Sequence, residues 1–196
     1  MTEAISDRLV TELVDAVKDA IKKEDSERLR DVYLIGDLDR DAAKAAIQRL
    51  RELAADSSRP VTIYLNTPGG NVTDGLAIHD VVRQLVSQGL EIAIVVQGMA
   101  YSMGSVVLQA ASPGRRLAYE HSWIMIHEPA KWAGWQSTTA AAQHLDRLKQ
   151  MQNQIYRILA ERAGKPLKQI IRDTKRNDFY LDAMRAREYG LIDEII

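Results

Sequence analysis

The sequence has no cysteine and almost no surplus charge of either sign. Without cysteine, its 196 residues can form neither a disulfide nor a thiolate nucleophile. Lysine and arginine number 26, and aspartate and glutamate number 27, so the formal net charge is -1. Such a balanced chain offers no large basic field for a phosphate backbone, and we expect no nucleic-acid partner.

Long apolar runs and the usual metal-binding spacings are also missing. No apolar stretch is long enough to span a bilayer, and the N-terminus lacks the basic and apolar regions of a secretory signal. We therefore expect a cytoplasmic protein with no membrane partner. None of the four histidines forms a paired zinc-ligand spacing, so we expect no metal and no other cofactor.

What the sequence does contain is an alternation of apolar strands and amphipathic helices. Strands are predicted at 31–39, 61–66, 91–96 and 122–129, helices at 41–55, 72–86, from about 102, at 137–164 and at 167–174, and a loop at 112–119. This order predicts a one-domain α/β fold with right-handed crossovers around a largely parallel sheet. Residues 1–30 differ, because they predict an amphipathic helix over 5–22 and a polar linker.

The segment VVQGMAYSMGSVVLQAA, residues 95–111, places one serine between a predicted strand and a predicted helix. Functional groups of α/β sheets gather where strands end and helices begin. There, the hydroxyl of Ser102 could attack a carbonyl while free backbone N–H groups hold the developing oxyanion. Serine is also a common helix N-cap and glycine a common turn residue, so this pattern alone is weak evidence.

Two other strand ends strengthen the case for a nucleophilic serine. In TPGGN, Gly69 and Gly70 would let a backbone approach the serine closely, and the Lys-Ser/Thr of a phosphate-binding loop is absent. His127, in MIHEP, ends another buried strand at the same edge and is the candidate general base. The carboxylate that would orient it stays open among Asp173, Asp178, Asp182 and Asp193.

Four motifs together resemble the proteolytic subunit of the Clp protease, the ClpP family. They are YLNTPGGNVTDGLAIHD, GMAYSMGSVVLQAA, MIHEP and AREYGLID, in the family's order and at similar separations, from about residue 31 to 196. The resemblance implies the ClpP (crotonase-like) fold, with 136–163 as a protruding handle helix. It also implies a serine endopeptidase that cleaves peptides and unfolded proteins by acyl transfer.

The same resemblance assigns roles to individual residues. Ser102 would be the nucleophile and His127 the base, and the N–H groups of Gly70 and Met103 would form the oxyanion hole. A peptide would lie extended alongside Gly69 and Gly70 and the segment 130–137.

Two residues compete for the acid position. An alignment anchored on EYGLID places Asp178 there, and one anchored on RDTKR places Asn177 there. We favour Asp178, because the downstream match is longer and needs no gap.

The resemblance further implies a stacked-ring homo-oligomer, two heptameric rings joined by their handle helices, that acts on protein or peptide substrates. Residues 1–30 do not resemble the family's N-terminal hairpin, which engages an ATP-driven (AAA+) unfoldase, so that partner stays open.

Three other functions are compatible with the sequence. A non-catalytic ring subunit would keep the fold without the activity. A crotonase-type acyl-CoA enzyme would share the fold and the N–H oxyanion hole but would not need Ser102 and His127. A serine/lysine dyad would need Lys131 as the base.

Overall fold

The computed structural model describes residues 13–21, 30–128 and 137–196. The chain divides into two compact units, Met1–Asp31 and Val32–Ile196. In the first unit, residues 13–21 form a helix, which is the described part of the helix predicted over 5–22. Its apolar side chains, including Leu13 and Ile21, are exposed.

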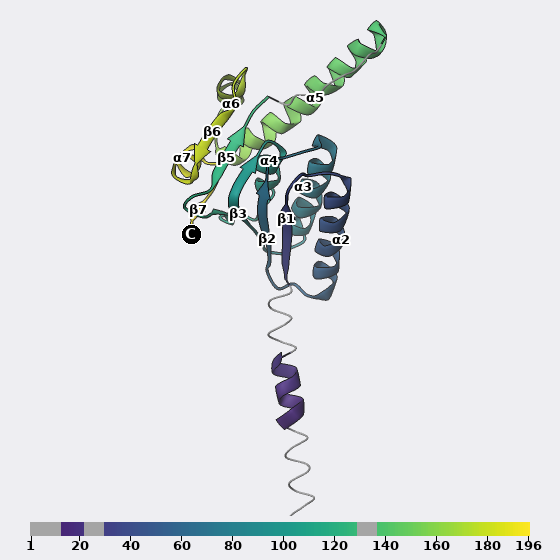
Figure 1. The fold of residues 1–196 in the computed structure, drawn as a ribbon, viewed down its shortest axis with the longest axis vertical. Helices are drawn as coiled ribbons and strands as arrows, with labels where there is room; N and C mark the ends of the chain where they lie inside the picture. The colour runs from purple at the N-terminus through teal and green to yellow at the C-terminus, as the bar shows by residue number, and fades with distance from the viewer. Residues whose placement is uncertain (1–12, 22–29, 129–136) are drawn as a thin grey trace, which may run out of the picture. The chain divides into compact units, whose positions relative to one another are not determined.

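Strands and helices alternate along the rest of the chain (Figure 1). The strands are β1 (Asp31–Ile35), β2 (Val61–Thr67), β3 (Ile92–Tyr101), β4 (Arg116–Ala118), β5 (Trp123–Ile126), β6 (Phe179–Asp182) and β7 (Glu194–Ile195). The helices are α2 (Arg40–Asp56), α3 (Val72–Ser87), α4 (Met103–Leu108), α5 (Thr138–Ala163), α6 (Leu167–Thr174) and α7 (Ala183–Tyr189). This is the α/β alternation that the sequence predicts.

Within the described residues the seven strands form one sheet, whose main path runs β1-β2-β3-β4-β7. β3 pairs in parallel with β2, β4 and β5, and β4 pairs in parallel with β7, so the predicted largely parallel sheet is confirmed. β5 and β6 pair antiparallel. The sheet forks along β3, because Ile94–Val96 pair with β4 whereas Met99–Tyr101 pair with β5.

One part of the core lies between the sheet and helices α2 and α3, and the same core continues to α5, α6 and α7. Buried and half-buried residues alternate along β2, as expected for a strand with one covered face. Ile63 of β2 is fully buried, together with Leu50 of α2 and Ile78 of α3, and Figure 1 shows these two helices side by side.

Side-chain caps and a glycine fix the helix ends. Asp39 accepts a hydrogen bond from the N–H of Ala42 at the start of α2. Asn71 accepts one from the N–H of Thr73 at the start of α3. Gly164 ends α5 in the left-handed conformation, which glycine adopts without a steric penalty.

The structure shortens the strands predicted at 31–39 and 122–129 to Asp31–Ile35 and Trp123–Ile126, and it corrects two further predictions. The predicted loop over 112–119 contains β4, a strand of three residues, which is too short for a recognisable apolar pattern. The strand predicted at 91–96 continues to Tyr101, because β5 extends the edge along which β3 can pair.

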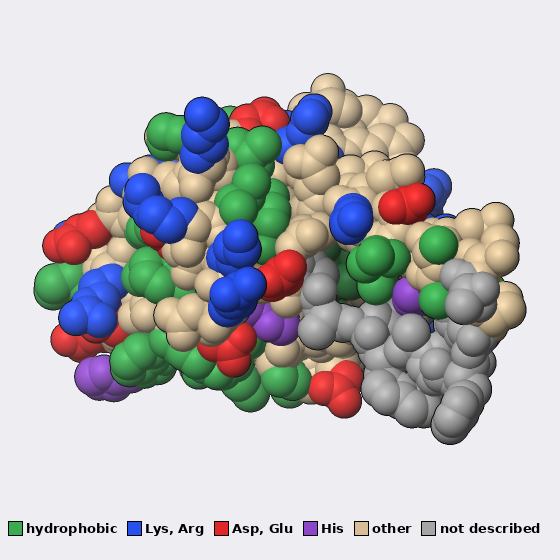
Figure 2. All heavy atoms as spheres, turned by 90° about the horizontal axis from the view of Figure 1, so that it is seen from above, with side chains coloured by type: hydrophobic (Ala, Val, Ile, Leu, Met, Phe, Trp, Pro, Cys, Tyr) green, Lys and Arg blue, Asp and Glu red, His purple; other side chains and the backbone are tan. Residues whose placement is uncertain are grey.

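The surface carries no large field of one charge on the face that Figure 2 shows. Lysine and arginine side chains are interspersed there with aspartate, glutamate and hydrophobic side chains. Among the described residues, the helices are too short or too polar to cross a membrane.

An ion pair between buried Arg116 and half-buried Asp193 joins β4 to the C-terminal segment of the chain. Arg116 donates from Nε to Asp193 Oδ2 at 3.1 Å and from Nη2 to Oδ1, while its backbone N–H donates to Oδ2 at 2.9 Å. Burial alone would raise the pKa of Asp193, but the hydrogen bonds from Arg116 outweigh it, and the pKa lies below its usual value. The carboxylate is therefore held in its charged form.

Replacing Asp193 by asparagine should reduce the free energy of unfolding by about 3 kcal/mol at pH 7, because Arg116 would stay buried without a counter-charge. The lowered pKa makes this stabilisation present above the unfolded-state value of about 4 and lost as the pH falls through the folded-state value. Urea unfolding should therefore give a difference between wild type and variant at pH 7 that shrinks towards pH 3.

Glu91→Gln is the matched control, because Glu91 pairs with the neighbouring Arg115 at the surface, where both side chains are about half exposed. This change should cost less than about 1 kcal/mol. Equal stability of Asp193→Asn and wild type at pH 7 would contradict the role given to the pair.

Candidate active site

Ser102 stands alone between β3, which ends at Tyr101, and α4, which begins at Met103. Its φ of 52° and ψ of -120° are unusual for a residue other than glycine and carry a strain of about 1–3 kcal/mol. Its side chain makes no capping hydrogen bond with α4, although Ser102 occupies the N-cap position. A capping role therefore does not account for this serine, and its hydroxyl is available for another partner.

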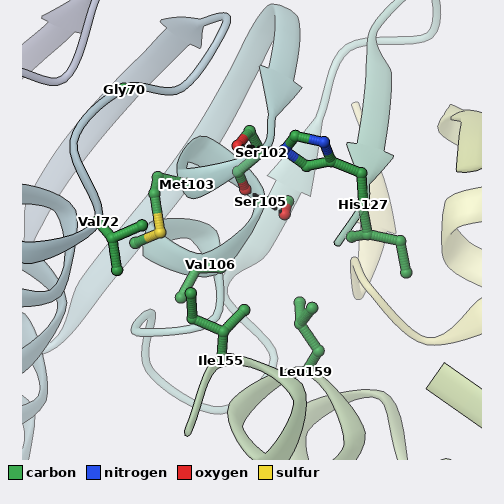
Figure 3. A pocket seen from close by; sticks show the side chains of 10 residues that line it. Gly70, Val72, Ser102, Met103, Ser105, Val106, His127, Ile155 and Leu159 are labelled. Carbon is green, nitrogen blue, oxygen red and sulfur yellow. Dashed lines mark hydrogen bonds between the residues drawn. The ribbon is translucent and has the colours of Figure 1, made fainter. Parts of the chain in front are cut away.

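That partner is His127. Ser102 Oγ lies 2.7 Å from His127 Nε2, and the two side chains point toward each other in Figure 3. The sheet brings them together, because Tyr101 pairs with Met125 and the Ser102 N–H donates to the Met125 carbonyl at 2.9 Å. His127 follows β5 directly, so the base stands one strand away from the serine.

Asp178 lies on the other side of the histidine, with Oδ1 3.5 Å from His127 Nδ1. The antiparallel register explains this placement: Ile126 pairs with Phe179, so the next facing positions are 127 and 178. The side chains of facing residues on neighbouring strands extend to the same face of a sheet. Side chains alternate between the two faces along a strand, so Asn177, one residue earlier, is assigned to the opposite face. The structure therefore brings Asp178, rather than Asn177, to the histidine.

The glycine loop after β2 packs directly against the serine turn. A Cβ on Gly69, which has a φ of 104°, would lie 2.7 Å from the Cβ of Ser102. A Cβ on Gly70 would lie 2.4 Å from the carbonyl oxygen of Leu38. Only a residue without a side chain permits both approaches.

Gly70 and Met103 line the same small cavity as Ser102 and His127. In the part of the chain that the structure describes, neither backbone N–H group of Gly70 and Met103 donates a hydrogen bond. Two unused donors beside a hydroxyl are what a developing oxyanion requires.

The cavity beside the serine is apolar at its far end. Its volume is about 60 Å³, and its apolar lining comes from four elements: Val72, Met103, Val106, Ile126, Ile155 and Leu159. Figure 3 shows Ile155 and Leu159 reaching it from α5. The arrangement can hold an aliphatic side chain next to an attacked carbonyl.

The other candidate carboxylates have structural partners. Asp173 accepts a hydrogen bond from the Tyr189 hydroxyl, and burial together with this bond raises the pKa of Tyr189. Asp182 caps α7 by accepting from the N–H of Arg185. Asp193 binds Arg116.

The remaining histidines lie away from the cavity. His79 is buried in α3, where burial lowers its pKa, and neither His121 nor His144 lines the cavity. Among the described residues no cluster of three or more histidine, aspartate or glutamate side chains could hold a metal ion. Of the predicted peptide-binding segment 130–137, residues 130–136, with Lys131, lie outside the described part.

Sequence reasoning missed the part that α5 plays in the cavity. Ile155 and Leu159 belong to the apolar series of the long helix, which is a periodic signal. That period shows that these residues share a face of the helix but not what the face covers.

The family model described as Clp protease matches residues 17–196 of the chain. Among solved structures, a point mutant of ClpP1 from Listeria monocytogenes is similar, with a TM-score of 0.79 and 28% sequence identity. The similarity covers 90% of this chain and 95% of that one. The fold and the family resemblance predicted from the four motifs are thus confirmed.

Replacing Asp178 by asparagine should slow the reaction of Ser102 with a fluorophosphonate probe by about 10³-fold or more. An amide beside His127 Nδ1 cannot stabilise the imidazolium and favours the wrong tautomer. Asn177→Ala is the matched control and should react at the wild-type rate, which stopped-flow labelling can measure. The reverse pattern, with Asn177 essential and Asp178 dispensable, would contradict the register argument.

Proposed function

The chain belongs to the Clp protease family, and we propose that it is a serine-type endopeptidase that cleaves peptides and unfolded proteins. The observation that carries the proposal is the 2.7 Å contact between Ser102 Oγ and His127 Nε2, beside two unused N–H donors. Asp178 completes the set on the far side of the imidazole.

In the proposed reaction, Ser102 Oγ attacks the carbonyl carbon of a peptide bond while His127 Nε2 takes the hydroxyl proton. Asp178 orients the imidazole and stabilises its positive charge. The tetrahedral intermediate collapses when His127 returns the proton to the leaving amine. Water then attacks the acyl-enzyme with the same base, which releases the carboxylic acid and regenerates Ser102.

The N–H groups of Gly70 and Met103 would bind the oxyanion of that intermediate. They belong to two different strand-to-helix junctions, which Gly69 allows to approach each other closely. Preorganised donors of this kind each contribute about 10²–10³-fold to the rate. A crotonase-type enzyme would use the same N–H groups but would leave the Ser102–His127 contact without a role.

We propose that the residue before the cleaved bond is apolar. The cavity that would receive its side chain offers Val106, Ile155 and Leu159 as walls and no charged group. An acidic or basic side chain there would lose its hydration without gaining a partner.

A ring-shaped homo-oligomer is part of the proposal. The first half of α5 is largely exposed in the single chain, and Leu145 on it is 51% exposed, whereas burial becomes regular only from Ile155 on. The first half of α5 thus makes few contacts with its own subunit, as expected for the protruding handle helix of the family. Two stacked rings would join through these helices.

Ser102→Ala is the first test of the proposed function. It should lower the hydrolysis of fluorogenic peptides by at least about 10⁴-fold, because no other group replaces the attacking oxygen. The particle mass measured by light scattering should equal that of the wild-type assembly. Ser87→Ala, at an exposed helix end, is the control and should stay fully active. Unchanged hydrolysis by Ser102→Ala would end the proposal.

Peptides that differ only in the residue before the cleaved bond test the apolar cavity. Leucine should be preferred over lysine or aspartate by about 100-fold in kcat/KM. Ile155→Ala enlarges the cavity and should raise the rate with phenylalanine relative to leucine by about 10-fold.

Ile158→Ala is the matched control on the same helix, because Ile158 packs on the core without lining the cavity. It should leave the preference unchanged. Equal preferences in Ile155→Ala and wild type would show that the side chain binds elsewhere.

A further inference from the structure

The strained conformation of Ser102 needs support from the residues around it, since a positive φ persists only where neighbouring groups impose it. The carbonyl oxygen of Ser102 accepts two hydrogen bonds from Ser105, one from the N–H at 3.0 Å and one from Oγ at 2.6 Å. Ser105 is 1% exposed and lines the cavity beside Ser102. The hydroxyl of Ser105 thereby holds the turn that carries the nucleophile.

Gln109 continues this support at the other end of the short helix α4. It is fully buried, and its Nε2 donates to the carbonyl oxygens of Ser105 at 3.0 Å and Leu191 at 3.2 Å. Its Oε1 accepts from Arg116 Nη1 at 2.8 Å. Both donors and the acceptor of the amide are thus used, in a place where packing alone would favour an apolar residue.

Arg116 is the common anchor of three helices. Besides Gln109, its Nη1 donates to the carbonyl oxygen of Arg162 in α5 and to that of Gly190 after α7. Its other nitrogens bind Asp193. α5 also supplies Ile155 and Leu159 to the cavity. Arg116 therefore binds both α5, which forms a wall of the cavity, and Gln109 at the end of α4, the helix that follows Ser102.

We propose that Gln109 is a positioning residue for Ser102. Through Ser105 on one side and Arg116 on the other, it fixes the nucleophile turn relative to the cavity wall that α5 provides. Gln109 itself touches no substrate. This inference rests on the proposed function, because the position of Ser102 matters for catalysis only if Ser102 attacks the substrate.

Gln109→Met keeps a side chain of similar length without its polar groups. It should lower kcat for a leucine-containing peptide by about 10-fold and change KM by less than about 2-fold, because a displaced nucleophile affects the transition state rather than binding. Ser105→Ala should act in the same direction. Ser87→Ala, which removes a hydroxyl bonded to the carbonyl of Gln84 far from the cavity, should change neither constant.

The double variant Ser105→Ala/Gln109→Met distinguishes positioning from a general loss of packing. If the two residues act as one chain of hydrogen bonds, the double variant should be about as slow as the slower single variant. Independent, multiplicative losses, or wild-type kcat in both single variants, would overturn the proposal. If Gln109→Met fails to fold, Gln109→Glu takes its place in the same test, because it keeps an acceptor for Arg116 Nη1 and loses the donor to the Ser105 carbonyl.

Hydrogen–deuterium exchange separates this inference from the proposed function. In Gln109→Met, the amides of 105–109 should lose protection while those of α2 and α3 keep it. If the wild type fails to react with a fluorophosphonate, the proposed function falls, and exchange alone then decides whether Gln109 holds the turn. Unchanged protection over 105–109 would overturn the inference even in an active enzyme.

Discussion

The pairing of β3 with β5, and of β5 with β6, is the interaction on which the whole candidate site depends. Backbone hydrogen bonds keep neighbouring strands about 4.8 Å apart, which is the spacing that side-chain hydrogen bonds can bridge. Ser102, His127 and Asp178 each stand just beyond or before one of these three strands. The three side chains lie together because the paired strands end at the same edge of the sheet, so their positions do not depend on a flexible loop.

Local patterns in the sequence were sufficient to predict most of the fold and two of the three side chains of the candidate site. The strand–helix alternation predicts the main elements, and the glycine-rich junctions single out Ser102 and the loop at Gly69 and Gly70. His127 follows from its place at the end of an apolar strand. Each of these signals lies within about ten residues of chain, which is the range over which periodicity and turn chemistry act.

The acid position could not be settled in the same way, because it depends on contacts between distant segments. β6 has four residues, one of them an exposed tyrosine, so it lacks the apolar run that marks a strand. Aligning motifs along the chain leaves Asn177 and Asp178 as neighbouring candidates. Only the register of β6 with β5 shows which of the two side chains lies on the same face of the sheet as His127. Likewise, two adjacent arginines look alike in SPGRRLAY, yet strand alternation exposes Arg115 and buries Arg116.

The antiparallel register of β5 and β6 has a consequence for how this chain can change over evolutionary time. The residue that faces His127 is fixed by the pairing of Phe179 with Ile126, because it directly precedes Phe179. Its distance along the chain from the end of α6 at Thr174 does not matter. Insertions or deletions between Thr174 and Asp178 therefore lengthen or shorten only a surface connection. Related chains can differ in length at this connection and still keep a carboxylate opposite the imidazole.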